Sequence, residues 1–322
     1  MKSIFTKLLF MFTDHTSVIV AGGEDFKYLE VVEVFGNKLG CDIPDLPHQA
    51  YSQPSVFQLG QNIFVCGGTK YSESDRPHYS MRQCYKLVDK KWIEYNSLIS
   101  NRTFATHITT KTDEVYIFGG TYSPYDSEIL RLNDTKWQKG PDIPDGLDKG
   151  CGVRISETEL LLIGGYKTSK RILKYTINDG KWHNTSIHLE IGRFSHRCIL
   201  YQNKVFVTGG IDTDPDSFEP YTRSTEIIEI GKNGELSIRN GPKLYIGRNG
   251  HGMGIITVGR TPTLIAFGGW NSYNANNAID VWLEFKIWNT TKYKWKTSRN
   301  MFMSQPKGAF GFATVSTDLI CP

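Results

Sequence analysis

Six Gly-Gly pairs, each at the end of a short apolar run, constrain the fold of this chain more than any other feature. They follow the segments SVIVA, NIFVC, EVYIF, ELLLI, KVFVT and TLIAF, at intervals of 45, 52, 45, 45 and 59 residues. A recurring unit of this length with one apolar strand in each copy is typical of repeat proteins. The pairs are Gly22 and Gly23, Gly67 and Gly68, Gly119 and Gly120, Gly164 and Gly165, Gly209 and Gly210, and Gly268 and Gly269.

One unit, residues 150–184, shows the expected strands clearly. KGCGVRI and ELLLIGG predict two strands, the second short and apolar enough to be buried on both faces. RILKYTI alternates as a half-buried strand does, and Asn178-Asp179-Gly180 predicts a tight hairpin turn before a short strand, KWHN. Four antiparallel strands therefore fit in one unit.

Tryptophan recurs near the start of the expected fourth strand in four units. A large aromatic side chain at this place is expected to pack between neighbouring sheets. Tyr85 and Tyr175 stand seven residues before two of these tryptophans, whereas units one and five carry Leu39 and Leu236 in place of the tryptophan. The four residues are Trp92, Trp137, Trp182 and Trp295.

The Gly-Gly pair, followed by a spaced Tyr and Trp, resembles the kelch repeat. The resemblance implies an all-β fold, a six-bladed kelch β-propeller with four-stranded antiparallel blades. We expect a single domain over 13–322, preceded by a segment, 1–12, that is a strand, a cap or the incomplete start of a gene model. A cleaved signal peptide is disfavoured because Lys7 interrupts the apolar stretch.

The two ends of the chain compete to complete the first sheet. Residues 308–317, GAFGFATVST, read as an innermost strand that no further Gly-Gly follows. Propellers usually close by pairing strands from both termini. We expect 308–317 to pair beside SVIVAGG, in preference to residues 3–12, because its small residues resemble those of RTFATHITT and NGHGMGII.

The cysteines and the charge bear on the compartment and on the class of partner. Cys66 and Cys84 are a candidate disulfide, and CDIPDLP, VCGG and QCYKL resemble animal kelch proteins that look secreted. Four N-glycosylation sequons support secretion weakly, but six reduced, buried cysteines are the favoured alternative, so the compartment stays undecided with a cytoplasmic one slightly preferred. The net charge of +4 is diffuse and no apolar run reaches 18 residues. We therefore expect neither nucleic-acid binding nor membrane insertion.

No catalytic or metal-binding constellation is recognisable. His107, His196 and His251 lie near innermost strands, but they lack metal-ligand spacing, so no metal and no cofactor are expected. We expect a non-catalytic scaffold that binds a protein or peptide. The alternative is a carbohydrate-active or metal-dependent propeller enzyme, similar to galactose oxidase or to a sugar mutarotase.

Binding is expected on the loop face, which we define as the connections from second to third strands together with those from each blade to the next. Arginine and aromatic side chains dominate interface hot spots. The arginines are expected at the rim of the central channel, where an acidic partner would meet them. The candidate partner-binding residues are Arg102, Arg193, Arg248, Tyr122, Tyr125, Trp270 and Tyr273.

Overall fold

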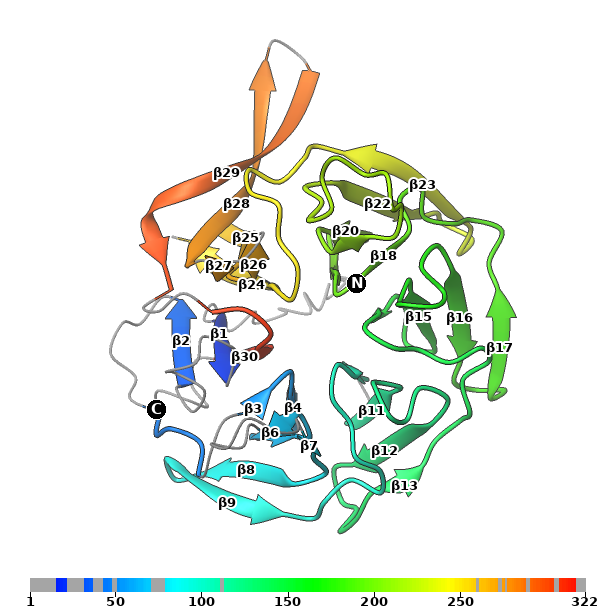
Figure 1. Ribbon diagram of the computed structural model, residues 1–322, viewed down its shortest axis with the longest axis vertical. Helices are drawn as coiled ribbons and strands as arrows, with labels where there is room; N and C mark the ends of the chain where they lie inside the picture. The colour runs from blue at the N-terminus through cyan, green and yellow to red at the C-terminus, as the bar shows by residue number, and fades with distance from the viewer. Residues whose placement is uncertain are drawn as a thin grey trace, which may run out of the picture.

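The chain forms a β-propeller in which sheets are arranged in sequence order around a centre (Figure 1). The computed structural model describes residues 16–21, 32–36, 43–47, 51–70, 79–110, 113–258, 261–271, 274–275, 277–287, 290–303 and 307–316. The expected segment 1–12 lies outside these residues, as do Gly22, Gly23 and Tyr273.

Five sheets are four-stranded and antiparallel, and in each the chain runs outward from the innermost strand. They comprise β4 (Ser55–Leu59), β5 (Asn62–Cys66), β8 (Cys84–Val88) and β9 (Lys91–Tyr95); β10 (Thr106–Thr109), β11 (Glu114–Phe118), β12 (Ser127–Arg131) and β13 (Gln138–Lys139); β14 (Cys151–Arg154), β15 (Glu159–Ile163), β16 (Ile172–Thr176) and β17 (Lys181–Asn184); β19 (Arg197–Tyr201), β20 (Lys204–Thr208), β22 (Thr225–Ile230) and β23 (Leu236–Gly241); and β24 (Gly252–Val258), β25 (Thr261–Phe267), β28 (Ala278–Ile287) and β29 (Thr290–Phe302).

The first Gly-Gly unit forms a three-stranded sheet in the order β2-β1-β30, with β1 at Thr16–Ala21, β2 at Val32–Gly36 and β30 at Gly311–Ser316. The prediction of six four-stranded blades is therefore wrong in its count, because the described residues form five. Residues 37–42, which follow β2, lie outside the described residues. Strand β30 pairs antiparallel with β1 from Thr16↔Ser316 to Ala21↔Gly311. This pairing confirms that the C-terminal strand lies beside the first.

Short strands on the connections extend three of the units. They are β3 (Tyr51–Ser52), β6 (Thr69–Lys70) and β7 (Tyr79–Ser80); β18 (Arg193–Phe194) and β21 (Ile211–Asp212); and β26 (Trp270–Asn271) and β27 (Asn274–Ala275). In two of these groups, the strand after the Gly-Gly pair bonds to the strand that enters the same unit: β3 to β6, and β18 to β21. These ladders fix the start of the loop that follows.

Apolar side chains pack between neighbouring sheets. Phe57, Ile117 and Trp137 belong to one such cluster, between the sheet of β4 and the sheet of β10. The Trp137 indole also donates to the carbonyl of Asn96, 3.2 Å away at the end of the neighbouring sheet. Trp92, Trp182 and Trp295 contact equivalent inter-sheet clusters. Because each cluster needs two sheets, no single unit buries its apolar side chains alone.

The Gly-Gly pairs turn the chain away from the second strand of each sheet. Gly119 and Gly120 have φ values of +60° and +99°, in the region that favours glycine. At the equivalent Gly67, an added Cβ would lie 2.6 Å from the carbonyl oxygen of Arg102, so the neighbouring connection leaves no room for a side chain. The pairs thus bring the chain onto the loop face and against the next connection.

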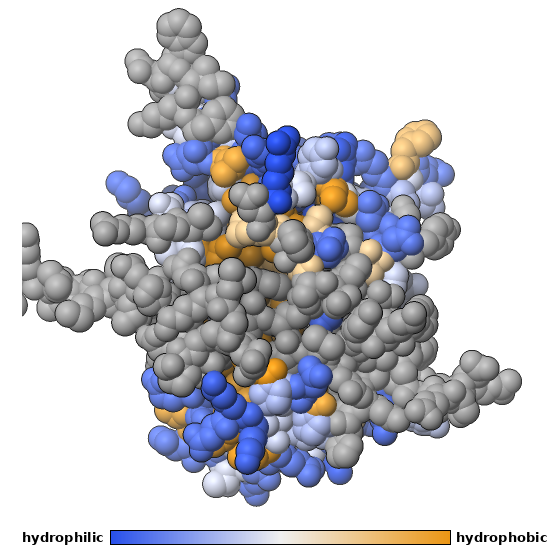
Figure 2. Space-filling view, turned by 90° about the vertical axis from the view of Figure 1, so that its left-hand side faces the viewer, coloured by the Kyte–Doolittle hydropathy of each residue, from blue (hydrophilic) through white to orange (hydrophobic). Residues whose placement is uncertain are grey.

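Strands β28 and β29 are longer than the others and form a hairpin that projects beyond the ring (Figure 1). On the side of the molecule that lies at the left in Figure 1, the described surface is mostly hydrophilic, with smaller apolar areas between the hydrophilic residues (Figure 2). None of the described residues forms a helix that is long and apolar enough to cross a membrane.

Candidate functional site

The exposed aromatic side chains of the described residues all lie on the loop face. Four connections between second and third strands carry most of them, and Tyr245 lies on the connection from β23 to β24. Tyr122 and Tyr125 expose 68% and 54% of their surface. By contrast, the opposite hairpins carry an exposed aliphatic residue, Leu132, between β12 and β13. The exposed aromatics are Tyr79, Tyr122, Tyr125, Tyr166, Phe218 and Tyr245.

A lysine lies among aromatic rings on the same face. The Lys149 ammonium is 4.7 Å from the ring centre of Phe104 and 5.9 Å from that of Tyr166. Tyr166 in turn meets the edge of Phe194, with ring centres 5.2 Å apart. Such cation–π contacts stabilise the lysine ammonium without a carboxylate partner. Lys149 was not among the predicted binding residues, although it lies two residues before an innermost strand just as Phe104 does.

The arginines expected at the rim are buried, so their assignment to partner binding is wrong. Arg102, Arg193 and Arg248 are each at most 2% exposed. Their guanidinium groups form ion pairs with an acid on the third strand of the same unit: Arg102 with Glu128 at 2.8 Å, Arg193 with Glu226 at 2.6 Å and Arg248 with Asp280 at 3.0 Å. A charge can be buried only when it is paired and hydrogen-bonded, and these three are.

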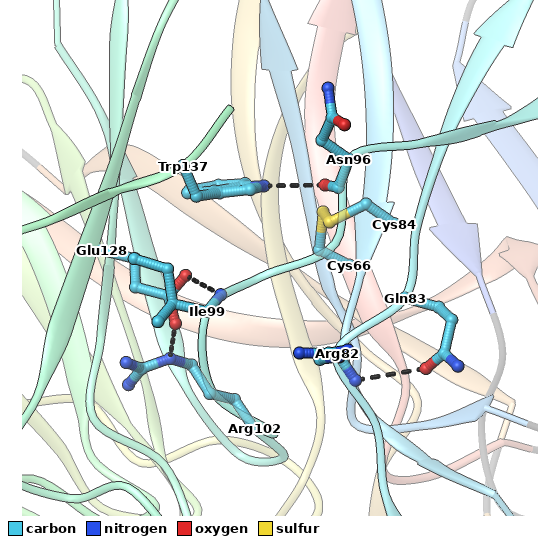
Figure 3. The surroundings of a disulfide bond; sticks show 9 residues. All are labelled: Cys66, Arg82, Gln83, Cys84, Asn96, Ile99, Arg102, Glu128 and Trp137. Carbon is cyan, nitrogen blue, oxygen red and sulfur yellow. Dashed lines mark hydrogen bonds and ion pairs between the residues drawn. A yellow bond between two sulfur atoms is a disulfide. The ribbon is translucent and has the colours of Figure 1, made fainter. Parts of the chain in front are cut away.

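Each of these guanidinium groups also holds the Gly-Gly turn of its own unit. Arg102 donates to the carbonyl of Gly119 at 2.9 Å, and Arg193 and Arg248 donate to Gly209 at 2.9 Å and Gly268 at 2.7 Å. Figure 3 shows Arg102 reaching Glu128, which also accepts a hydrogen bond from the backbone N–H of Ile99. Two of these arginines, Arg102 and Arg193, therefore hold the loops that carry Tyr122, Tyr125 and Phe218.

Two disulfides are present among the described residues, one within a sheet and one between neighbouring sheets. Cys66 and Cys84 are joined across β5 and β8, with Cα atoms 4.1 Å apart (Figure 3). Cys151 and Cys198 join β14 to β19, the innermost strands of neighbouring sheets, with Cα atoms 5.9 Å apart. The second pair was missed and the favoured alternative of six reduced cysteines is not what the structure shows. A signal existed, because both cysteines lie at the start of an innermost strand in consecutive units. Cys41 and Cys321 lie outside the described residues.

His107 lines the central cavity, whereas His196 and His251 are fully buried, and all three have a lowered pKa. Burial, and next the charge of Arg197, lower the pKa of His107 to about 4. Burial and then the nearby arginines hold the pKa of His196 and of His251 well below the usual range. Within the described part of the chain, no group of three or more His, Cys, Asp or Glu side chains is arranged to hold a metal ion.

The four aromatic candidates for partner binding differ in how accessible they are. Trp270 is half-buried in β26, where its carbonyl accepts a backbone hydrogen bond from Asn249 at 3.1 Å. Its ring packs so closely over Gly308 that a Cβ there would clash with the indole. Trp270 is thus part of the connection itself, while Tyr273 lies outside the described residues. Of the predicted binding residues, the structure leaves Tyr122 and Tyr125 open to a partner.

Comparison with known proteins supports the fold. No family profile matches the chain, and no curated protein matches it. Among solved structures, it is similar to one described as "Structure of YjhT", with a TM-score of 0.62 and 10% sequence identity over 78% of this chain and 86% of that one. At this identity the likeness shows the β-propeller fold alone.

Proposed function

We propose that this protein is a non-catalytic scaffold that binds a protein or peptide through the aromatic side chains of its loop face. The observation that carries the proposal is the gathering of all six exposed aromatic side chains of the described residues on that one face. Tyrosine and phenylalanine offer large contact areas at a low cost in conformational entropy. Scattered exposed apolar residues are ordinary, but a one-sided set of aromatics is typical of an interface.

The rigidity of the loop face supports this assignment. Buried ion pairs hold three of its connections to the sheets beneath, and each guanidinium bonds a Gly-Gly carbonyl. Anchored loops lose little entropy when a partner binds, so more of the contact energy appears as affinity. With Arg102, Arg193 and Arg248 paired inside the protein, we do not infer an acidic partner from them.

We also propose that the propeller is of the kelch type and works in an oxidising compartment. The kelch assignment rests on the recurring Gly-Gly pairs and tryptophans. The compartment rests on the two disulfides, which persist where thiols are not kept reduced. Three sequon asparagines, Asn101, Asn133 and Asn184, are exposed, as an N-glycosylation site must be.

Affinity capture with a matched control tests the loop face. Tyr122, Tyr125 and Phe218 are changed together to serine, and a control variant carries Ile93→Ser and Leu132→Ser, which are exposed but away from these loops. Extracts of the source tissue are passed over wild-type and variant proteins, and captured proteins are quantified by crosslinking mass spectrometry. We expect a partner that the control retains and that the triple variant loses at least about tenfold, since hot-spot residues contribute about 2 kcal/mol or more.

The thermal unfolding of both variants is measured first, to show that the loops stay folded. A partner that the triple variant keeps, and whose crosslinks map to the hairpins opposite the loop face, would contradict the proposal.

A further inference from the structure

The innermost strands enclose a cavity of about 610 Å³ at the centre of the propeller. Residues from β4, β10, β14, β19 and β30 line it, so its wall is built from sheets far apart in sequence. The wall is mixed, with apolar Ile108 and Phe312 beside polar Gln58, His107 and Arg197. A cavity of this size that combines apolar side chains with placed polar groups is typical of a site for a small organic molecule.

Two arginines on this wall, Arg154 and Arg197, form no ion pair with an acid among the described residues. Arg197 stands at the start of β19, and no carboxylate among the described residues lies within ion-pair distance of its guanidinium. Its contacts are with neutral groups: the carbonyl of His196 at 3.1 Å, the side-chain oxygen of Gln53 at 3.5 Å and the ring of Phe312 at 5.6 Å. Arg197 therefore differs from the three arginines that are fully paired inside the sheets.

The surroundings keep this charge isolated. Burial lowers the pKa of Arg197 to about 10, so the guanidinium stays protonated at neutral pH. His107, with its pKa lowered to about 4, is neutral under the same conditions. Asp113, the carboxylate that the described residues place on the cavity wall, follows β10 at the opposite end of the innermost strands from Arg197. Arg154 lies at the same end of the cavity as Asp113. It is the last residue of β14, whereas Cys151, the first residue of β14, lies at the same level as Arg197.

We propose that the central cavity binds a small organic carboxylate with an apolar body, and that Arg197 holds its carboxylate. A guanidinium is a planar fork that matches a carboxylate in geometry as well as in charge. Hydrogen bonds between two charged groups are shorter and stronger than those between neutral groups. Phe312, which is half-buried beside Arg197, can contact the apolar part of the ligand. This site is distinct from the loop face and does not depend on its function.

Benzoate is the probe, and benzamide is its neutral control of the same shape. Binding is measured by isothermal titration calorimetry on the wild type, on Arg197→Gln and on Arg197→Lys. We expect benzoate to bind the wild type, benzamide to bind at least about tenfold more weakly, and Arg197→Gln to lose at least about tenfold in benzoate affinity, since a hydrogen bond between charged groups is worth about 1.5–3 kcal/mol. Arg197→Lys retains the charge and should keep part of the affinity.

Arg239→Gln is the matched surface control, because Arg239 is exposed and pairs with Glu229. It should bind benzoate as the wild type does. Arg154→Gln, in the same cavity, tests which guanidinium is the anchor and should keep most of the affinity. Thermal unfolding shows that each variant is folded. The proposal is overturned if benzoate does not bind at millimolar concentration, if benzamide binds equally well, or if Arg197→Gln binds benzoate unchanged.

Discussion

At the residue scale, the main stabilising feature is an ion pair between an arginine before an innermost strand and an acid on the third strand of the same sheet. Glu128, Glu226 and Asp280 stand at the same register position of their sheets, opposite the next-to-last residue of the second strand. Two units that lack the arginine carry Tyr85 or Leu173 there instead, whereas the first unit, with Lys307 before its innermost strand, carries Glu33. The arginine and the acid thus occur together in the same units of the sequence. The arginine motif alone does not identify its acidic partner, because that partner lies 26 to 33 residues away in the chain.

The strand β22 provides a matched test of such a pair. Glu226→Gln removes the charge that balances buried Arg193, whereas Glu229→Gln removes the partner of exposed Arg239 on the same strand. We expect Glu226→Gln to lower the free energy of unfolding by about 3–5 kcal/mol, because it leaves a buried charge uncompensated. Glu229→Gln should cost less than about 1 kcal/mol. Urea denaturation measures both, and equal losses would contradict the assignment.

At the scale of elements, the sequence predicted the second strands best. Each apolar run before a described Gly-Gly pair is a strand, from β5 to β25, because an apolar run ended by a backbone turn is a local signal. The hairpin turn at Asn178-Asp179-Gly180 was predicted for the same reason and joins β16 to β17. Contacts between units were not predictable in this way. The disulfide between β14 and β19 depends on two innermost strands lying side by side, which no local pattern specifies.

The two disulfides are expected to stabilise the fold by different amounts. They close loops of 18 and 47 residues, and the longer loop restricts the unfolded chain more. In the chain-entropy description, removing them costs about 3 kcal/mol for Cys66 and Cys84 and about 4 kcal/mol for Cys151 and Cys198. Urea denaturation of the two double serine variants measures these costs.

Peptide mapping without reductant, on protein from its native compartment, identifies the bonds directly. Free thiols at all four positions would contradict both the pairing and the oxidising compartment. Sensitivity of the same protein to an N-glycosidase is the independent check on that compartment.

At the scale of the whole molecule, the ring depends on one strand pair. Every other neighbouring pair of strands in a sheet belongs to one continuous stretch of chain, but β1 and β30 come from the two ends of the sequence. The choice between the two termini was predictable because 308–317 repeats the small residues of other innermost strands. The number of complete four-stranded blades was not predictable, since the Gly-Gly pairs mark second strands and carry no information about the outermost ones.

Removal of residues 307–322 is expected to open the ring. Val18 and Val20 pack with Phe310 in the cluster between the last sheet and the first, so the deletion exposes apolar surface on both sides of the gap. We expect a melting temperature lower by roughly 10 °C or more, because several kcal/mol of packing is lost and each kcal/mol shifts the melting temperature of a chain this size by about 2–4 °C. A synthetic peptide of residues 307–316 should restore part of the loss. Unchanged melting of the shortened chain would refute this closure.

Because Thr16 and Ser316 are paired neighbours, the order of the sheets around the centre is cyclic while the order of the chain is linear. The same cyclic arrangement of sheets is therefore compatible with chain ends at other connections. A short linker from 316 to 16, with new ends at an exposed hairpin such as 178–180, would keep every sheet in its place. We therefore expect a circular permutant of this chain to keep the same fold.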